Sequence, residues 1–253
     1  LQRSIDGGNP ATAPGDVLIF NAGAAAVTYA ASSLTAAGSA AVNFSNIESI
    51  SINTTSSPYT LTGTSGADNL TVTPVDADTI KYAFDGQPTV TVDGISAFVF
   101  DGGDGADTMT VVLSGSTTFL MGGLTFNGQD PATNPGDQLV LIGGTFATVT
   151  HNLTGIGAGN IDLNSDATSE ITYTGLEPVN STGSTMNNLV FNILAAGTTD
   201  AVLSDHGTAT DGNSQLKFTG ASSLEDIIFA NPAGSVTINS AGTNSVVGLA
   251  NMD

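Results

Sequence analysis

Residues Asn9 to Asp16 read NPATAPGD, and residues Asp130 to Asp137 read DPATNPGD, 121 positions later. Six of the eight positions are identical, and each copy is followed by an apolar run, Val17 to Phe20 or Leu139 to Ile142. The prolines and the Pro-Gly step favour a turn and remove backbone donors just before a strand begins. We therefore interpret each octapeptide as the joint at which a structural unit starts.

The repeat extends beyond the octapeptide. NFSNIESISI (43–52) matches TYTGLEPVNS (172–181), because an aromatic residue is followed three positions later by Ile-Glu or Leu-Glu. A shorter pattern, a strand next to Gly or Asn, recurs near Val42, Val90, Ile171 and Leu216. These matches predict two tandem β-rich repeat units, residues 1–122 and residues 123–253.

Short alternating segments predict strands throughout the chain. Leu70 to Thr73, Thr89 to Val92 and Met109 to Val112 carry β-branched or aromatic residues at period two and are bounded by turn residues. Repeats nested within repeats in an all-β chain favour a solenoid, and a right-handed parallel β-helix is the preferred fold. The alternative is two tandem β-sandwich domains with a linker near 122–136.

The charge balance narrows the choice of partners. Lys and Arg total 3 against 23 Asp and Glu, which gives a formal net charge of −20. Nucleic acid and anionic membrane surfaces are disfavoured because both require clustered cations. A chain this acidic repels itself unless cations or salt screen the charge, so divalent cations are expected companions.

Two segments predict calcium loops. GGDGADTMT (102–110) fits the nonapeptide pattern G-G-x-G-x-D-x-U-x at every defined position, and GTSGADNLT (63–71) fits it less one glycine. Glycines allow the tight turn, while carbonyls and carboxylates supply hard oxygen ligands. Both segments can also be Gly-Asp turns that hold no ion. The candidate ligand positions are Gly63, Ser65, Asp68, Asp101, Gly102, Asp104 and Asp107.

On these two motifs the chain resembles haemolysin-type calcium-binding repeats and, more broadly, the repeat regions of large secreted bacterial surface proteins and adhesins. The resemblance is specific over these two motifs and compositional elsewhere. It implies calcium as a ligand and an extracellular or cell-surface location. The chain begins at Leu1 without a charged and apolar leader, which we interpret as a mature secreted subunit or a part of a longer chain.

Five sequons predict possible N-glycan acceptors, at Asn43, Asn53, Asn69, Asn152 and Asn180. His151 and His206 lie in no recognisable catalytic motif. A lyase acting on acidic sugars needs clustered Arg or Lys, and the chain has neither such clusters nor tryptophan platforms for sugars. The sequence therefore favours a non-enzymatic protein, with a polysaccharide-binding or polysaccharide-degrading β-helix protein as the alternative.

The expected function is a structural or adhesive one. VVGLANMD (246–253) resembles MGGLTFNG (121–128), so the second unit stops about where another would begin. Open β edges template further pairing unless they are capped. We therefore expect a repeat unit of a cell-surface or matrix fibre that is stabilised by calcium. Its partners would be further copies joined head-to-tail into a homopolymer, neighbouring repeats of a longer chain, or extracellular polysaccharide.

Overall fold

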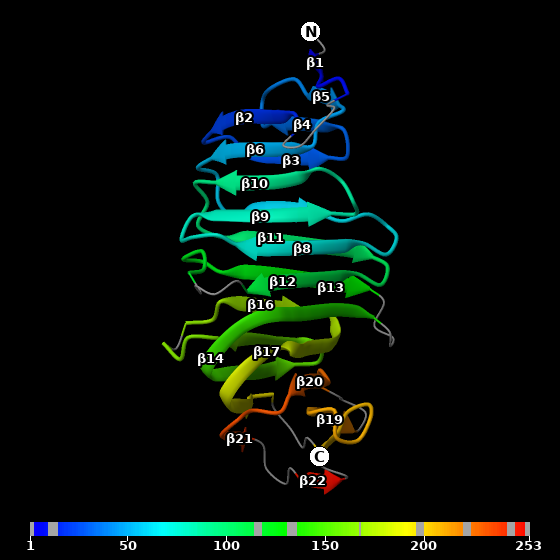
Figure 1. The fold of residues 1–253 in the computed structure, drawn as a ribbon, viewed down its shortest axis with the longest axis vertical. Helices are drawn as coiled ribbons and strands as arrows, with labels where there is room; N and C mark the ends of the chain where they lie inside the picture. The colour runs from blue at the N-terminus through cyan, green and yellow to red at the C-terminus, as the bar shows by residue number, and fades with distance from the viewer. Residues whose placement is uncertain are drawn as a thin grey trace.

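The computed structural model describes residues 3–9, 15–113, 118–130, 136–166, 168–195, 200–219, 224–241 and 246–250. All helical or strand elements in these ranges are β-strands. Figure 1 shows them stacked along one long axis, with β1 (Arg3–Asp6) near one end and β22 (Val247–Ala250) at the other. The all-β prediction is confirmed, and none of the described residues belongs to a helix that could cross a membrane.

Strands that are distant in sequence pair in parallel and form ladders along the long axis, and each strand of a ladder is called a rung. The β2 ladder joins β2 (Val17–Gly23), β6 (Ser49–Thr54) and β10 (Thr89–Asp93). The β7 ladder joins β7 (Tyr59–Thr62), β11 (Phe98–Asp104), β13 (Leu124–Asp130) and β16 (Ile171–Thr174). The β8 ladder joins β8 (Asn69–Pro74), β12 (Thr108–Leu113), β14 (Asp137–Gly155), β17 (Leu176–Ile193), β20 (Ile227–Ala230) and β21 (Ser235–Ser240).

Antiparallel strands interrupt the parallel ladders at intervals. β9 (Thr79–Phe84) lies between β8 and β10, and β15 (Ala158–Asp162) lies between β14 and β16. β19 (Asn213–Thr219) lies between β18 (Asp200–Asp205) and β20, and β18 also pairs in parallel with β22. In the first layer, β3 (Val27–Ala30), β4 (Ser33–Ala36) and β5 (Val42–Ser45) form a meander, and β5 pairs in parallel with β1. The result is a set of large mixed sheets.

The core follows from the period-two pattern. β6 and β12 alternate half-buried and buried residues, so every second side chain points inward. In-register pairing then stacks like residues on one another: Phe98 lies 6.1 Å from Tyr59, and Phe126 lies 5.2 Å from Phe100 between ring centroids. These aromatic columns bury apolar area together with the more numerous aliphatic side chains of the core.

The half-buried positions carry hydrogen-bonded polar side chains. The Nδ2 group of Asn192 donates to Asn152, and that of Asn239 donates to Asn192, at 2.8 and 2.9 Å. The predicted repeat boundary at 122/123 precedes β13, and strand pairing crosses it, because β11 pairs with β13 and β12 pairs with β14. The division into two repeat units stays a prediction.

Candidate functional site

A close contact in space between a glycine and the side chain of an aspartate recurs in the structure. It is found at both kinds of sequence motif, the nonapeptides and the octapeptides. An ideal Cβ on Gly63 would overlap Oδ2 of Asp68, and one on Gly102 would overlap Oδ2 of Asp107. The same contacts relate Gly7 to Asp16 and Gly128 to Asp137, at the ends of the two octapeptides. A Gly–Asp contact thus occurs within both nonapeptides and, at each octapeptide, between its last residue and a glycine that lies two residues before its first residue. Residues 10–14 and 131–135, within the octapeptides, lie outside the described residues.

The buried aspartates of these contacts bind backbone amides of the preceding layer. Oδ1 of Asp107 accepts the N–H of Asp68 at 2.9 Å, and Oδ1 of Asp137 accepts the N–H of Asp107 at 2.8 Å. Asp68 itself accepts the N–H and the hydroxyl of Thr64. All three aspartates are buried, and we call them the carboxylate column. Its hydrogen bonds satisfy amide groups at the start of β8 and β12.

The other predicted calcium ligands lie in different surroundings. Asp101 points away from the core and accepts a hydrogen bond from Asn127 at 2.6 Å, and Asp104 and Ser65 are exposed. Burial raises the pKa of both Asp68 and Asp107 above the ordinary range. The structure therefore separates the predicted ligands into buried and outward positions. Calcium binding at these loops stays a prediction.

The five predicted glycan acceptors also differ in their surroundings. Asn69 is exposed, and Asn43 is half-buried in β5. The amide nitrogens of Asn53 and Asn152 donate to Asn21 and Asn160, and the amide oxygen of Asn180 accepts from Thr182 of its own sequon. Asn69 is thus the acceptor that is most open to modification.

A second acidic site lies in the loop between β15 and β16. Ligand oxygens of Asp162, Asp166 and Glu170 lie within 4.8 Å of one another, and no other group of three acidic, histidine or cysteine residues does so in the described ranges. Asp162 is the last residue of β15, and Glu170 precedes the first residue of β16. Because β15 and β16 pair antiparallel, the two ends of this loop are brought together. We call these residues the acidic triad.

Hydrogen bonds within the loop hold the two buried carboxylates, Asp162 and Glu170. Oδ1 of Asp162 accepts the N–H groups of Asn164 and Ser165, at 3.0 and 2.6 Å. Glu170 accepts the N–H of Leu163 at 2.7 Å and the side-chain amide of Asn164 at 2.8 Å. Both carboxylates are buried, so their positions do not depend on a bound ion. This arrangement preorganises two oxygen ligands for a hard cation.

The third member, Asp166, is exposed to solvent. Hydrogen bonds from Thr168 lower its pKa, whereas burial raises the pKa of Glu170. A cation at the acidic triad would favour the ionised form of Glu170 and would bind more tightly as the pH rises. The triad can therefore act as a pH-dependent site for a hard cation.

The sequence contains a signal for this triad that motif matching missed. Oxygen-bearing side chains occupy every second position from Asp162 to Glu170, in the order Asp, Asn, Asp, Thr, Glu. Calcium loops of the helix-loop-helix type place side-chain ligands at positions 1, 3 and 5, a backbone carbonyl at position 7 and often a water-mediated ligand at position 9, so the side-chain pattern agrees at the first three positions. The invariant glycine of that pattern is replaced here by Ala167, so a search for the full motif passes over it.

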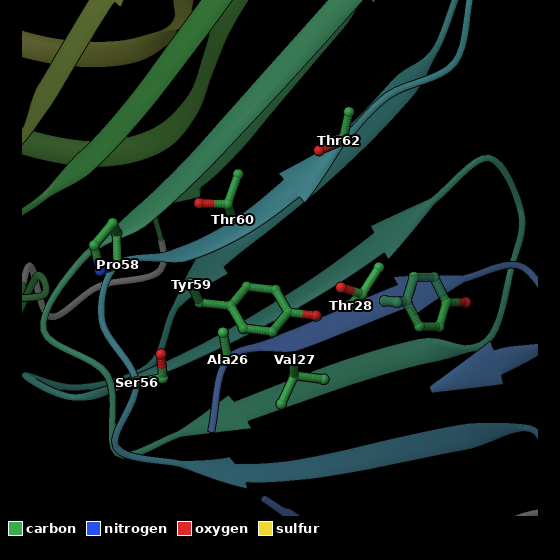
Figure 2. A pocket seen from close by; sticks show the side chains of 9 residues that line it. Ala26, Val27, Thr28, Ser56, Pro58, Tyr59, Thr60 and Thr62 are labelled. Atoms are coloured by element: carbon green, nitrogen blue, oxygen red, sulfur yellow. The ribbon is translucent and has the colours of Figure 1, made fainter. Parts of the chain in front are cut away.

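A groove runs between the neighbouring edges of β3 and β7. Two cavities of about 250 and 310 Å³ share Tyr29 and Thr62 in their walls. Figure 2 shows Thr28 of β3 beside the ring of Tyr59, with Thr60 and Thr62 further along β7. Hydroxyl groups and tyrosine rings suit a neutral saccharide. Polysaccharide binding nevertheless stays a prediction.

Comparisons with protein-family models, with curated proteins and with solved structures give no match. The functional conclusions below therefore rest on this chain's own residues.

Calcium titration of the Asp166→Asn variant tests the acidic triad. We expect the calcium stoichiometry measured by calorimetry to fall by one, because Asp166 supplies the solvent-side ligand of the triad and its exposed side chain contributes little to the fold. Asp104→Asn is the matched control, since Asp104 is an exposed aspartate in the nonapeptide loop. Loss of calcium in the control instead of the triad variant would place the ion where the nonapeptide pattern predicted it.

Proposed function

We propose that this chain is a non-enzymatic extracellular protein, a structural or adhesive unit of a cell-surface or matrix fibre. We further propose that its sheets coil as a right-handed parallel β-helix that associates end to end. The parallel ladders carry this proposal, because β8, β12, β14, β17 and β20 stack in register along the long axis (Figure 1). The right hand rests on the general preference of parallel crossovers.

The strands at both ends of the stack support end-to-end association. Among the described residues β2 pairs only with β6, β21 only with β17 and β22 only with β18. β1, near the N-terminal end, pairs only with β5 and carries Arg3 and Asp6, whereas β2, β21 and β22 carry no charged residue. Val17 and Ile19 on β2 are 54% and 62% exposed, and Leu249 on β22 is 73% exposed. Apolar edge strands without charged residues favour pairing with a further strand. A second copy, or a neighbouring repeat of a longer chain, would cover these edges.

Charge and cations are part of the same proposal. A net charge of −20 opposes association of two copies, so assembly requires salt or divalent cations. Calcium at the acidic triad would reduce the repulsion within each copy.

Analytical sedimentation and electron microscopy of the double variant Val17→Thr/Ile19→Thr test end-to-end association. We expect the wild-type chain at physiological salt to form assemblies that grow with concentration. The variant should need an about tenfold higher concentration, because it loses apolar contacts at each junction. The control, Val75→Thr/Ile156→Thr, changes two residues of similar exposure (52% and 65%) in turns away from the ends. Monomers alone at every concentration of the wild type would contradict self-association.

A further inference from the structure

Two glutamates lie beside each other where β17 meets β20. These strands pair in parallel with Val179 opposite Ile227, and Val179 donates its N–H to the carbonyl of Asp226 at 3.1 Å. Glu177 and Glu225 each lie two residues before a paired position. Adjacent strands are about 4.8 Å apart, so this register brings the two side chains into one region. The separation of 48 residues conceals this pair in the sequence.

The pair is buried and has few hydrogen-bond donors, since the backbone N–H of Val179 is the one donor that acts on the carboxyl of Glu225 among the described residues. Glu225 is 1% exposed, and neither of its carboxylate oxygens meets full hydrogen-bond geometry with any partner among the described residues. Oε2 of Glu177 is also buried without a partner, although the residue as a whole is half-buried. One edge of the pair is thus open toward solvent through Glu177.

A tyrosine provides a second, independent sign of a ligand. Tyr173 of β16 is fully buried, and its hydroxyl has no hydrogen-bond partner in the part of the chain that the structure describes. The hydroxyl lies over Gly159 of β15, where a Cβ would contact it at 2.5 Å. Two residues before Gly159, the carbonyl of Gly157 accepts the N–H of Leu176, the neighbour of Glu177, at 3.1 Å, which places the hydroxyl in the region of the pair. The charge of Glu225 also raises the pKa of this phenol, in addition to the larger effect of burial. A buried hydroxyl without a partner costs about 1–3 kcal/mol, which a bound ligand would relieve.

No basic side chain neutralises the two glutamates. Lys217, the nearest candidate, lies 3.9 Å from the carboxylate of Asp226. Burial, and to a smaller extent the charges of Glu177 and Asp226, together raise the pKa of Glu225 to about 9. Two like charges in one buried region require either a proton or a metal ion between them.

We propose that Glu177, Glu225 and the hydroxyl of Tyr173 form a buried site for a hard divalent cation, with calcium as the best fit. Carboxylate oxygens are hard ligands that calcium prefers, and its variable coordination suits an irregular set better than the octahedral geometry of magnesium does. Binding replaces the proton of Glu225, which leaves to solvent on the open side of Glu177. The site is separate from the acidic triad and does not depend on fibre formation.

Calorimetric titration of calcium into chelator-treated protein tests this site. The Asp166→Asn background removes the acidic triad, and two buffers of different ionisation enthalpy count the protons released. We expect one calcium ion to bind with release of about one proton near neutral pH, and Glu225→Gln to abolish both signals. Glutamine has the shape of the protonated glutamate, so the variant should keep the far-ultraviolet circular dichroism of the parent.

Two further variants separate a metal site from a simple proton site. Glu177→Gln and Tyr173→Phe should each weaken calcium binding by about tenfold or more, while Glu48→Gln, at an exposed carboxylate directly before β6, should leave it unchanged. Calcium binding without proton release, or equal binding in Glu225→Gln, would overturn the proposal. Absence of calcium binding in the Asp166→Asn background would also overturn it. The sedimentation test of end-to-end association is independent of this outcome.

Discussion

Replacement of Gly63 by alanine is expected to lower the free energy of unfolding by about 3 kcal/mol. A Cβ at this position would overlap the backbone carbonyl oxygen of Gly102 and Oδ2 of Asp68. The first of these atoms belongs to the next rung of the β7 ladder and cannot rotate away. The second accepts the N–H of Thr64, so moving it breaks the first turn of the carboxylate column. Urea unfolding followed by circular dichroism measures the loss.

Gly66→Ala is the matched control for this variant. Gly66 belongs to the same nonapeptide, but the nearest atom to its Cβ position is the hydroxyl of Thr64 at 3.9 Å. The control should remain within about 0.5 kcal/mol of the wild type. Equal losses of stability in Gly63→Ala and Gly66→Ala would contradict this explanation. They would mean that the glycine at position 63 is not required for the close approach of the neighbouring strand and Asp68.

Without metal ions, the free energy of unfolding should fall steeply between about pH 5 and pH 9, and Glu225→Gln should remove most of this slope. Burial raises the pKa of Glu225 in the folded chain to about 9, from 4.5. Between those two values the folded chain holds one proton more than the unfolded chain. The free energy of unfolding therefore decreases by about 1.4 kcal/mol per pH unit.

The sign of this effect is opposite to that of a salt-bridged carboxylate. Stability is fully present below the pKa of the unfolded chain and is lost as the pH rises through the pKa of the folded chain. Unfolding in urea at several pH values with a chelator present measures the slope. Asp104→Asn, which removes an exposed carboxylate, should keep the slope of the wild type. A slope unchanged in Glu225→Gln would mean that this carboxyl is already ionised in the folded chain.

The local patterns predicted the elements well. Alternation in segments such as Leu70 to Thr73 and Met109 to Val112 predicted strands, and those segments lie in β8 and β12 with Leu70 and Met109 buried. The octapeptide repeat also has a structural counterpart, because Gly7 contacts Asp16 as Gly128 contacts Asp137. These features are local in the chain, so side-chain periodicity and turn chemistry are enough to predict them.

The shorter repeat was only partly right. Val42, Val90 and Ile171 lie in β5, β10 and β16, each the third strand of an antiparallel meander. Leu216 lies instead in β19, the middle strand of its meander, and the third strand there is β20. The pattern at Leu216 therefore does not mark the strand that corresponds to β5, β10 and β16. The reason is that the length of chain between the third strands of successive meanders varies.

The sequence by itself determined that the chain is all-β, which side chains alternate into the core, and where the Gly–Asp turns recur. The acidic triad could also have been predicted from the sequence, since Asp162, Asp166 and Glu170 lie within nine consecutive residues. Only the tertiary structure decided that Glu177 meets Glu225 and that Asp107 binds the amide of Asp68. Such contacts depend on which residue occupies the next rung, and rung partners are 30 residues apart between β12 and β14 but 48 apart between β17 and β20. That spacing depends on the lengths of loops and inserted strands. Local side-chain periodicity carries no information on which residues pair between layers, because hydrogen bonding between layers fixes that register only in the folded chain.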